Sequence, residues 1–323
     1  MREGSRDIIL NSSLKLRRNI KGFKFPSKMS YEDSLDVIEM VKPLFASKDY
    51  FELDELDEKY IETFISERIL SPDYEKNDVK IAFIILDDFI ITLNDEDHIT
   101  INVSDFGENL LDAYSLAKKI EKHIDNELDF SFDPEFGYLT SNAGFSGNGI
   151  DLKYKLFLYG ILANIENYIA VKATLAKDDL QLDKFLQKDN ENTLNNVFIL
   201  SLVGNYSYNF FEKLEKIQKD IDVIVSREKK FRNNYSILYG LNDDDALEKI
   251  EILKSNLKSG KVKSLAQMND NLYSLKMYQS LGYDIGIDSF KLNDAIFEIN
   301  KIKYEGNRNQ DRYEFLLKYM EEI

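Results

Sequence analysis

The first third of the chain changes from a helical to a strand-like spacing of hydrophobic residues. Over residues 31–70 hydrophobic side chains recur every three to four positions, which predicts helical structure. Two β-branched and aromatic runs, at 79–86 and 89–93, are separated by two aspartates and predict a hairpin. Residues 98–103 alternate apolar and polar side chains and predict a third strand, and the amphipathic pattern of 110–124 predicts a helix.

The middle of the chain combines a glycine-rich segment with further apolar stretches. Four of the 14 glycines fall within residues 137–151, which indicates irregular backbone or close approach of a ligand. Residues 152–176 are apolar and are predicted to be helical, whereas 197–203 are predicted to form a buried strand. A hydrophobic stripe over 210–224 predicts another helix.

Strand patterns end near residue 232. Beyond it, helices are predicted at 246–257, 264–281, 289–302 and 310–322. The sequence therefore predicts two domains, residues 1–232 and residues 233–323. Because the strands precede long helices instead of alternating with them, the predicted fold class is α+β with an all-helical C-terminal domain.

Charge is the feature of the composition that constrains function most. The chain has 42 basic and 58 acidic residues, which leave a net charge of −16. A field of this sign repels phosphates, so nucleic acid is excluded as a general partner. ATP can bind only where a local basic cluster overrides the field.

Absent and rare residue types exclude several kinds of chemistry. The chain has no cysteine and only two histidines, His98 and His123, which excludes disulfides, cysteine nucleophiles, and thiolate or histidine-rich zinc sites. We expect no protein-borne metal site and a cytoplasmic location. The charged residues 1–7 predict no signal peptide, and the apolar stretch 81–93 is too short and too charged to span a membrane.

Six short segments are informative through their order along the chain. They read N-S-S-L-K-L-R-R-N-I-K-G at 11–22, F-P at 25–26, I-L-S-P at 69–72, N-D-E-D-H at 94–98, G-Y-L-T-S at 137–141 and G-N-G at 147–149. In this order they resemble the S-S-R-x-R-L-A-R-N-L-x-G, F-P, L-I-S-P, N-E-E-D-H, G-Y-L-T-S and G-T-G segments of the bacterial protein-arginine kinases. The resemblance implies the fold of the ATP:guanido phosphotransferase (phosphagen kinase) family, an antiparallel sheet flanked by helices.

The resemblance also implies a reaction, in which the γ-phosphoryl group of ATP passes to a guanidinium nitrogen. Such a transfer needs positioning and positive charge around the phosphates, with Mg²⁺ brought by the nucleotide. Family carboxylates that orient the guanidinium and assist its deprotonation fall on Asp95 and Glu96. Together with Asp97, these residues can equally form a solvated acidic turn.

The sequence departs from the resemblance where the family places the arginines that hold ATP. Those arginines fall on Ser13, Lys15, Thr100, Asp151 and Lys184. The five positions carry one net positive charge instead of five. About 4 Å from a phosphate, each lost cation removes roughly 4 kcal/mol of attraction at an effective dielectric near 20, and Asp151 repels phosphate outright.

Further positions of the family pattern are also changed. The histidine beside the nucleotide base falls on Arg68, and the cysteine that contacts the substrate falls on Asn142. In the C-terminal R-D-x-x-R-A motif that reads phosphoarginine, only Asp311 is kept in place. We therefore expect impaired phosphoarginine binding as well.

The sequence leaves three functions open: first an impaired regulatory or binding subunit, second an active kinase, and third an arginine-binding module. The first is a catalytically impaired protein-arginine kinase-like protein that acts as a regulatory or binding subunit. The resemblance implies an active arginine kinase, its adaptor or Clp-type protease components as its partners. The third is a module that binds arginine side chains through Asp95 and Glu96 without ATP.

The second function is an active ATP-dependent arginine kinase with a remodelled nucleotide site. The cations available to it are Lys15, Arg17, Arg18, Arg68 and Lys184. The first three form a small basic patch, which can partly replace the missing arginines or be an ordinary surface feature. His98 is expected to be a strand residue with a hydrogen-bonded ring, and the glycines at 144–149 a structural loop, since the GxxxxGK[ST] pattern is absent.

Overall fold

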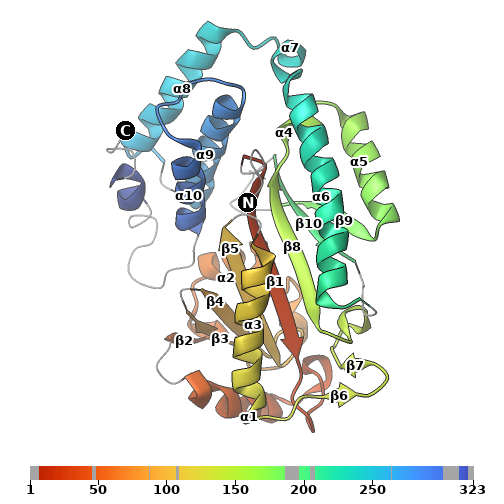
Figure 1. The fold of residues 1–323 in the computed structure, drawn as a ribbon. Coiled ribbons are helices and arrows are strands. Elements are labelled where there is room, and N and C mark those ends of the chain that lie inside the picture. The colour runs from red at the N-terminus through yellow and green to blue at the C-terminus, as the bar shows by residue number, and fades with distance from the viewer. Residues whose placement is uncertain are drawn as a thin grey trace.

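An eight-stranded antiparallel sheet with the strand order β2-β3-β4-β5-β1-β8-β10-β9 organises the structure (Figure 1). The computed structural model describes residues 7–45, 49–86, 88–106, 109–185, 196–203, 208–262, 264–300 and 313–318. The strands of the large sheet are β1 (Ile9–Arg18), β2 (Asp49–Glu52), β3 (Ala82–Ile85), β4 (Phe89–Leu93), β5 (Ile99–Phe106), β8 (Ile150–Phe157), β9 (Leu180–Lys184) and β10 (Val197–Leu202). A second, two-stranded sheet pairs β6 (Phe132–Asp133) with β7 (Gly137–Tyr138).

Helices lie against the sheet and make up the C-terminal region. The α-helices are α1 (Tyr31–Val41), α2 (Glu58–Ser66), α3 (Leu110–Asp125), α4 (Tyr159–Leu162), α5 (Ile165–Lys177), α6 (Phe210–Arg232), α7 (Tyr235–Tyr239), α8 (Asp243–Lys258), α9 (Leu265–Ser280) and α10 (Ser289–Asn300). Short 3₁₀ helices are η1 (Pro26–Lys28), η2 (Lys42–Phe45), η3 (Leu53–Glu55), η4 (Tyr74–Lys76) and η5 (Ala143–Phe145). None of the helices in these ranges is long and apolar enough to cross a membrane.

The α+β class and the helical C-terminal region are confirmed. The hairpin of β3 and β4, the strands β5 and β10, and the helices α3 and α6 also lie where the hydrophobic pattern predicts them. Every element described beyond α6 is a helix. The division into two domains at residue 232 stays a prediction, because residues of the sheet and of the later helices share one hydrophobic core.

Two helical predictions were wrong. The interval 31–70 contains the edge strand β2 between α1 and α2. The interval 152–176 begins with β8, a central strand whose residues are all buried. In β8 aspartate and lysine alternate with leucine and tyrosine, so the true period is two, which the helical prediction did not take into account. Strands β1, β6, β7 and β9 were not predicted.

Strand alternation gives the sheet two different faces. One face is apolar: Leu14, Leu16, Leu152 and Tyr154 belong to a core shared with residues of α3, α5 and α6. These helices lie over the sheet in Figure 1. The neighbouring positions along β1 and β8 point to the opposite face, which is largely polar.

The C-terminal helices cover one end of the polar face. Phe157 at the end of β8 stacks on Tyr273 of α9 with ring centroids 5.6 Å apart, and the Tyr159 hydroxyl lies 2.7 Å from the Ser280 hydroxyl. Leu10 and Ile199 belong to the same hydrophobic core. The remaining polar end of the face therefore lies between the C-terminal helices and the turn that joins β4 to β5.

Candidate functional site

The polar face is built by the register of three central strands. Lys15 on β1 is paired with Asn102 on β5 and with Asp151 on β8, and Arg17 is paired with Thr100. Because residues two apart on a strand share a face, one surface gathers side chains from all three strands. They are Ser13, Lys15, Arg17, Thr100, Asn102, Asp151, Lys153 and Lys155.

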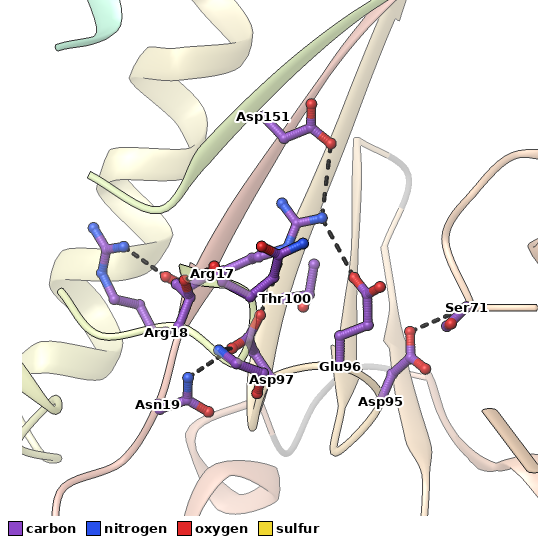
Figure 2. Close-up of polar contacts among 12 residues, drawn as sticks. Arg17, Arg18, Asn19, Ser71, Asp95, Glu96, Asp97, Thr100 and Asp151 are labelled. Carbon is purple, nitrogen blue, oxygen red and sulfur yellow. Dashed lines mark hydrogen bonds and ion pairs between the residues drawn. The ribbon is translucent and has the colours of Figure 1, made fainter. Parts of the chain in front are cut away.

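The guanidinium of Arg17 lies among three carboxylates (Figure 2). Its Nη2 atom is 3.5 Å from Oε2 of Glu96 and 3.7 Å from Oδ2 of Asp151, and its Nε atom is 3.6 Å from Oδ2 of Asp97. The Phe145 ring of η5 lies against the same guanidinium, 4.2 Å from Cζ to the ring centroid. Burial opposes the charge of Arg17, but the three carboxylates outweigh it and raise its pKa.

These contacts leave several buried polar atoms without hydrogen bonds. Only 4% of the Arg17 side chain is exposed, yet its Nε and Nη1 atoms have no hydrogen-bond partner in the described part of the chain. The same holds for Oδ2 of Asp97 and Oδ1 of Asp151. In the Arg17 cluster (Arg17, Glu96, Asp97 and Asp151), Arg17 thus has one long hydrogen bond, from Nη2 to Glu96 at 3.5 Å, and faces Asp97 and Asp151 at distances longer than hydrogen bonds.

The turn between β4 and β5 positions the carboxylates. Asn94 adopts φ of 59°, a left-handed conformation that asparagine tolerates, and its side chain donates to the backbone oxygens of Ser34 and Lys80. Asp95 accepts a hydrogen bond of 2.9 Å from the Ser71 backbone, and burial raises its pKa to about 6. The turn is therefore ordered by buried hydrogen bonds, unlike a solvated acidic loop.

Asp97 and Glu96 differ in how firmly they are held. Oδ1 of Asp97 accepts 2.7 Å hydrogen bonds from Asn19 Nδ2 and from the Ser141 backbone, so the side chain joins β1 to the glycine-rich segment. The Glu96 side chain is 49% exposed, and it accepts a hydrogen bond from Arg17 Nη2 at 3.5 Å. Glu96 is thus the carboxylate of the cluster most accessible to a molecule from solution.

The His98 ring is hydrogen-bonded as expected, although the residue lies in the turn just before β5 and not in the strand. Its Nδ1 atom accepts from the Ile20 backbone at 3.0 Å, and its Nε2 atom lies 2.8 Å from the Lys24 carbonyl oxygen. These two partners fix the tautomer with the proton on Nε2. Burial lowers the pKa of His98, which keeps the ring neutral.

Two buried lysines lie beside the Arg17 cluster. Burial, with the nearby charges of Lys153 and Arg17, lowers the pKa of Lys15 to about 7. Burial also lowers the pKa of Lys153, whose Nζ atom lies 2.8 Å from Oδ2 of Asp151. Burial alone would raise the pKa of Asp151, but Lys153 and Arg17 outweigh it and hold the pKa below its usual value. Asp151 is therefore an anion that neutralises the cations next to it.

Arg18 points away from this face and is part of the framework. Its Nε atom donates to Glu121 of α3 at 2.7 Å, and its Nη1 atom donates to the Arg17 and Asn148 carbonyl oxygens at 2.6 and 2.9 Å. The guanidinium stacks on Tyr138, 3.6 Å from Cζ to the ring centroid. In Figure 2 the Arg18 guanidinium points away from the Arg17 guanidinium, which is directed toward Glu96 and Asp151.

The other predicted site residues are distributed over several places. Ser13 and Thr100 lie on the polar face with Lys15 and Asp151. Arg68, at φ of 57°, forms a 3.0 Å ion pair with Asp183 of β9.

Two further predicted positions, Lys184 and Asn142, lie away from the polar face. Lys184 is opposite Phe198, so alternation places it on the helix-covered face of the sheet. Asn142 is exposed, and its Oδ1 atom caps η5 by accepting from the Gly144 backbone. Asp311 lies outside the described residues.

Sequence reasoning missed the central place of Arg17 and the contribution of Lys153. The alternation of Lys15 with Arg17, and of Asp151 with Lys153, would have placed all four on one face only if both 9–18 and 150–157 had been predicted as paired strands. The basic patch expected at Lys15, Arg17 and Arg18 is not a surface feature, because all three side chains are buried.

The residues of this face do not fit a magnesium-bound triphosphate. Such a group needs several cations free to contact phosphate oxygens, whereas Lys153 and Arg17 here face Asp151, and Arg68 faces Asp183. Within the described ranges no group of three or more histidine, aspartate or glutamate residues is arranged to hold a metal ion. The face instead offers carboxylates and an aromatic ring around a guanidinium.

Comparison with known sequences places most of the chain in one group of enzymes. The sequence model of the ATP:guanido phosphotransferase C-terminal catalytic domain matches residues 32–231. A protein-arginine kinase of Clostridium perfringens is 28% identical over 306 residues, covering 90% of this chain and 87% of that protein. A protein-arginine kinase of Staphylococcus haemolyticus is 23% identical over 294 residues, covering 90% of this chain and 86% of that protein.

Solved structures show the same fold. The duplicated taurocyamine kinase of Schistosoma mansoni, with bound transition-state analogue components, aligns with a TM-score of 0.59 at 13% identity over 79% of this chain. This chain spans only 38% of that duplicated enzyme. A lombricine kinase aligns with a TM-score of 0.56 at 14% identity, over 74% of this chain and 70% of that enzyme.

Proposed function

This chain belongs to the ATP:guanido phosphotransferase family, and from that premise we propose that it is a catalytically impaired protein-arginine kinase-like protein that acts as a binding or regulatory subunit. Its similarity to protein-arginine kinases over about nine-tenths of its length supports the kinase-like part of the proposal. The chemistry of the polar face supports the impairment.

The observation that carries the proposal is the ion pairing of Asp151. Oδ2 of this buried aspartate lies 2.8 Å from Lys153 Nζ and 3.7 Å from Arg17 Nη2. In the sequence resemblance the same position is an arginine that binds phosphate. A carboxylate there repels a phosphate and also pairs with Lys153 and Arg17, the cations next to it.

The size of the effect is sufficient for a large loss of rate. One unit charge about 4 Å from a phosphate contributes roughly 4 kcal/mol at an effective dielectric near 20. Removing a single preorganised stabiliser of a transition state lowers a rate on the order of a hundred- to a thousandfold. At Asp151 the charge is reversed, and at Thr100 and Ser13 it is lost, so several such losses combine. We therefore infer that this face does not support phosphoryl transfer from ATP at a useful rate.

The proposed partners follow from the family. We propose an active protein-arginine kinase, its adaptor or Clp-type protease components, in the cytoplasm, as the proteins that this subunit binds. Affinity purification from the native cell with the full chain as bait tests this part. Recovery of none of the three partner classes would contradict it.

A titration with Mg-ATP tests the impairment directly. Ligand at about 100 times its dissociation constant stabilises a protein by roughly 2.7 kcal/mol, which is readily seen as a rise in melting temperature. We expect no such rise up to millimolar Mg-ATP, and no heat of binding by calorimetry. Saturable binding at micromolar concentration would contradict the proposal.

The alternative is an active kinase with a remodelled nucleotide site. One observation favours it: Arg17 and Lys153 place two cations beside residue 151, so the local charge is not simply lost. Radiolabelled ATP with an arginine-rich protein substrate distinguishes the two functions. Phosphoarginine formation that is abolished by Glu96→Ala would establish the alternative, and its absence with a known active kinase as positive control supports impairment.

A further inference from the structure

We propose that the Arg17 cluster is a guanidinium-binding site occupied by the chain's own Arg17, which excludes arginine side chains of other molecules. The inference deepens the proposed function and rests on it, because it concerns the same polar face. The class of ligand is a planar guanidinium. The internal occupant is the specific claim.

The surroundings of Arg17 match the chemistry of a guanidinium. Carboxylates approach it from one strand and one turn, Asp151 from β8 and Glu96 and Asp97 from the turn after β4. Phe145 covers the planar face of the group at 4.2 Å. Carboxylates at the edge and an aromatic ring on the face are the arrangement that recognises a guanidinium rather than an ammonium.

The way Arg17 is held distinguishes it from a structural arginine. Its neighbour Arg18 makes hydrogen bonds of 2.6 to 2.9 Å through Nε and Nη1. Arg17 has no such bond on Nε or Nη1 within the described residues, and its three carboxylates lie 3.5 to 3.7 Å away. The short tether from β1 therefore brings the guanidinium among the carboxylates without optimal geometry.

The tether also explains why an external arginine is excluded. A group attached to the same chain competes as though present at an effective concentration of millimolar or more. An arginine side chain from a partner has to displace Arg17 and leave a buried cation without its counter-charges. Removing the Arg17 guanidinium should therefore create a vacant site with three carboxylates and an aromatic ring.

The test uses Arg17→Ala with methylguanidinium as the probe. Melting temperature and calorimetric binding are measured for the full chain against millimolar methylguanidinium chloride, with methylammonium chloride and sodium chloride at equal ionic strength as reference salts. We expect methylguanidinium to bind Arg17→Ala at least about tenfold more tightly than the wild type, a difference of about 1.4 kcal/mol. We also expect it to stabilise this variant more than methylammonium does.

Arg68→Ala is the matched control. It also removes an arginine from an ion pair, but Arg68 faces the single carboxylate of Asp183 and is 36% exposed. We expect no gain of methylguanidinium binding in this variant. Equal responses of the wild type, Arg68→Ala and Arg17→Ala, or equal stabilisation by the two organic cations, would overturn the proposal.

A second variant keeps the test decisive if Arg17→Ala does not fold. Arg17→Ala combined with Asp151→Asn removes one carboxylate together with the cation and leaves Glu96, Asp97 and Phe145. The same selectivity for methylguanidinium is expected, and its absence overturns the proposal. Mg-ATP binding by the wild type would contradict the proposed impairment but leaves this titration unaffected, so the two failures are distinguishable.

Discussion

Arg17 Nη2 lies 3.7 Å from Asp151 Oδ2, across the neighbouring strands β1 and β8. In the segments that the chain resembles, the position of Arg17 is an alanine and the position of Asp151 is an arginine. Relative to those segments, this chain has its arginine on β1 and a carboxylate on β8. In the proposed function this exchange connects the impaired nucleotide site to the proposed occupation of the guanidinium site, because Arg17 both pairs with Asp151 and lies in the Arg17 cluster.

The exchange can be reversed by the double change Arg17→Ala and Asp151→Arg. We expect the double variant to bind Mg-ATP at least about tenfold more tightly than the wild type, since a cation about 4 Å from phosphate contributes roughly 4 kcal/mol before solvent screening. Isothermal titration calorimetry measures the change. Asp151→Arg alone is the control, because it places two arginines side by side and should lower stability. Equal Mg-ATP affinities in the double variant and the wild type would contradict the electrostatic explanation.

Lys15→Met tests the burial of charge on the polar face through its pH dependence. The pKa of Lys15 is about 7 in the folded protein and 10.5 for the ordinary side chain, because burial disfavours the charged form. Between these values the unfolded chain holds a proton that the folded chain has lost, so the wild type gains stability as pH rises from 7 to 10.5. Lys15→Met should therefore be more stable than the wild type at pH 6, on the order of 3 kcal/mol, with a difference that shrinks toward pH 10.

Urea unfolding at pH 6, 7.5 and 9 measures this difference. Lys219→Met, at a largely exposed lysine, is the control and should stay within about 0.5 kcal/mol of the wild type at each pH. A difference between Lys15→Met and the wild type that does not change with pH would show that Lys15 is charged over the whole range.

Local patterns predicted most of the fold but not the centre of the site. The hairpin of β3 and β4 follows from two short β-branched runs, and α3 follows from an amphipathic stripe. Strand β8 did not follow, because all its residues are buried and its lysines and aspartate read as interruptions of an apolar helix. Its pairing with β1 depends on contacts between segments about 136 residues apart in sequence, which no local spacing specifies.

The same limitation applies to individual side chains. The N-D-E-D-H segment predicts the carboxylates at 95–97, whereas the sequence places Arg17 only in a small basic patch with Lys15 and Arg18. Whether an arginine is on the surface or buried depends on what lies opposite it, here Glu96, Asp97 and Phe145. Lys184 was expected at the nucleotide site but lies on the helix-covered face of the sheet. A shift of one residue in the pairing of β9 with β10 would move it to the polar face, and the sequence does not specify that pairing.

Gly149→Ala tests the close approach of the glycine-rich segment to β1. Gly149 has φ of 69°, and a Cβ atom there would lie 2.5 Å from both the Arg17 carbonyl oxygen and Arg18 Nη1. Gly22, at φ of 96°, has no atom within 4 Å of an added Cβ, so Gly22→Ala reports the backbone strain alone. We expect Gly149→Ala to lower the free energy of unfolding by about 2 kcal/mol more than Gly22→Ala does in urea titrations. Equal losses would mean that the segment moves aside without cost.

Glu228→Ala tests the junction from which the C-terminal helices continue. The Glu228 side chain is fully buried; it accepts hydrogen bonds of 2.8 Å from the backbone nitrogens of Gly160 and Ile161 in α4, and one of 2.7 Å from Arg232 Nε. Truncation leaves two backbone donors and a buried guanidinium without this carboxylate, although Asp7 still contacts Arg232. Breaking a buried pair from one side lowers stability by about 3–5 kcal/mol, and we expect a loss of this size in urea titrations.

The variant Glu228→Gln is the control. It keeps an acceptor but no charge, so it should lose less stability than Glu228→Ala. If both variants were as stable as the wild type, the contacts of Arg232 with Asp7 and with the Phe157 carbonyl oxygen would suffice to hold α6 against β8, and Glu228 would contribute nothing to the junction.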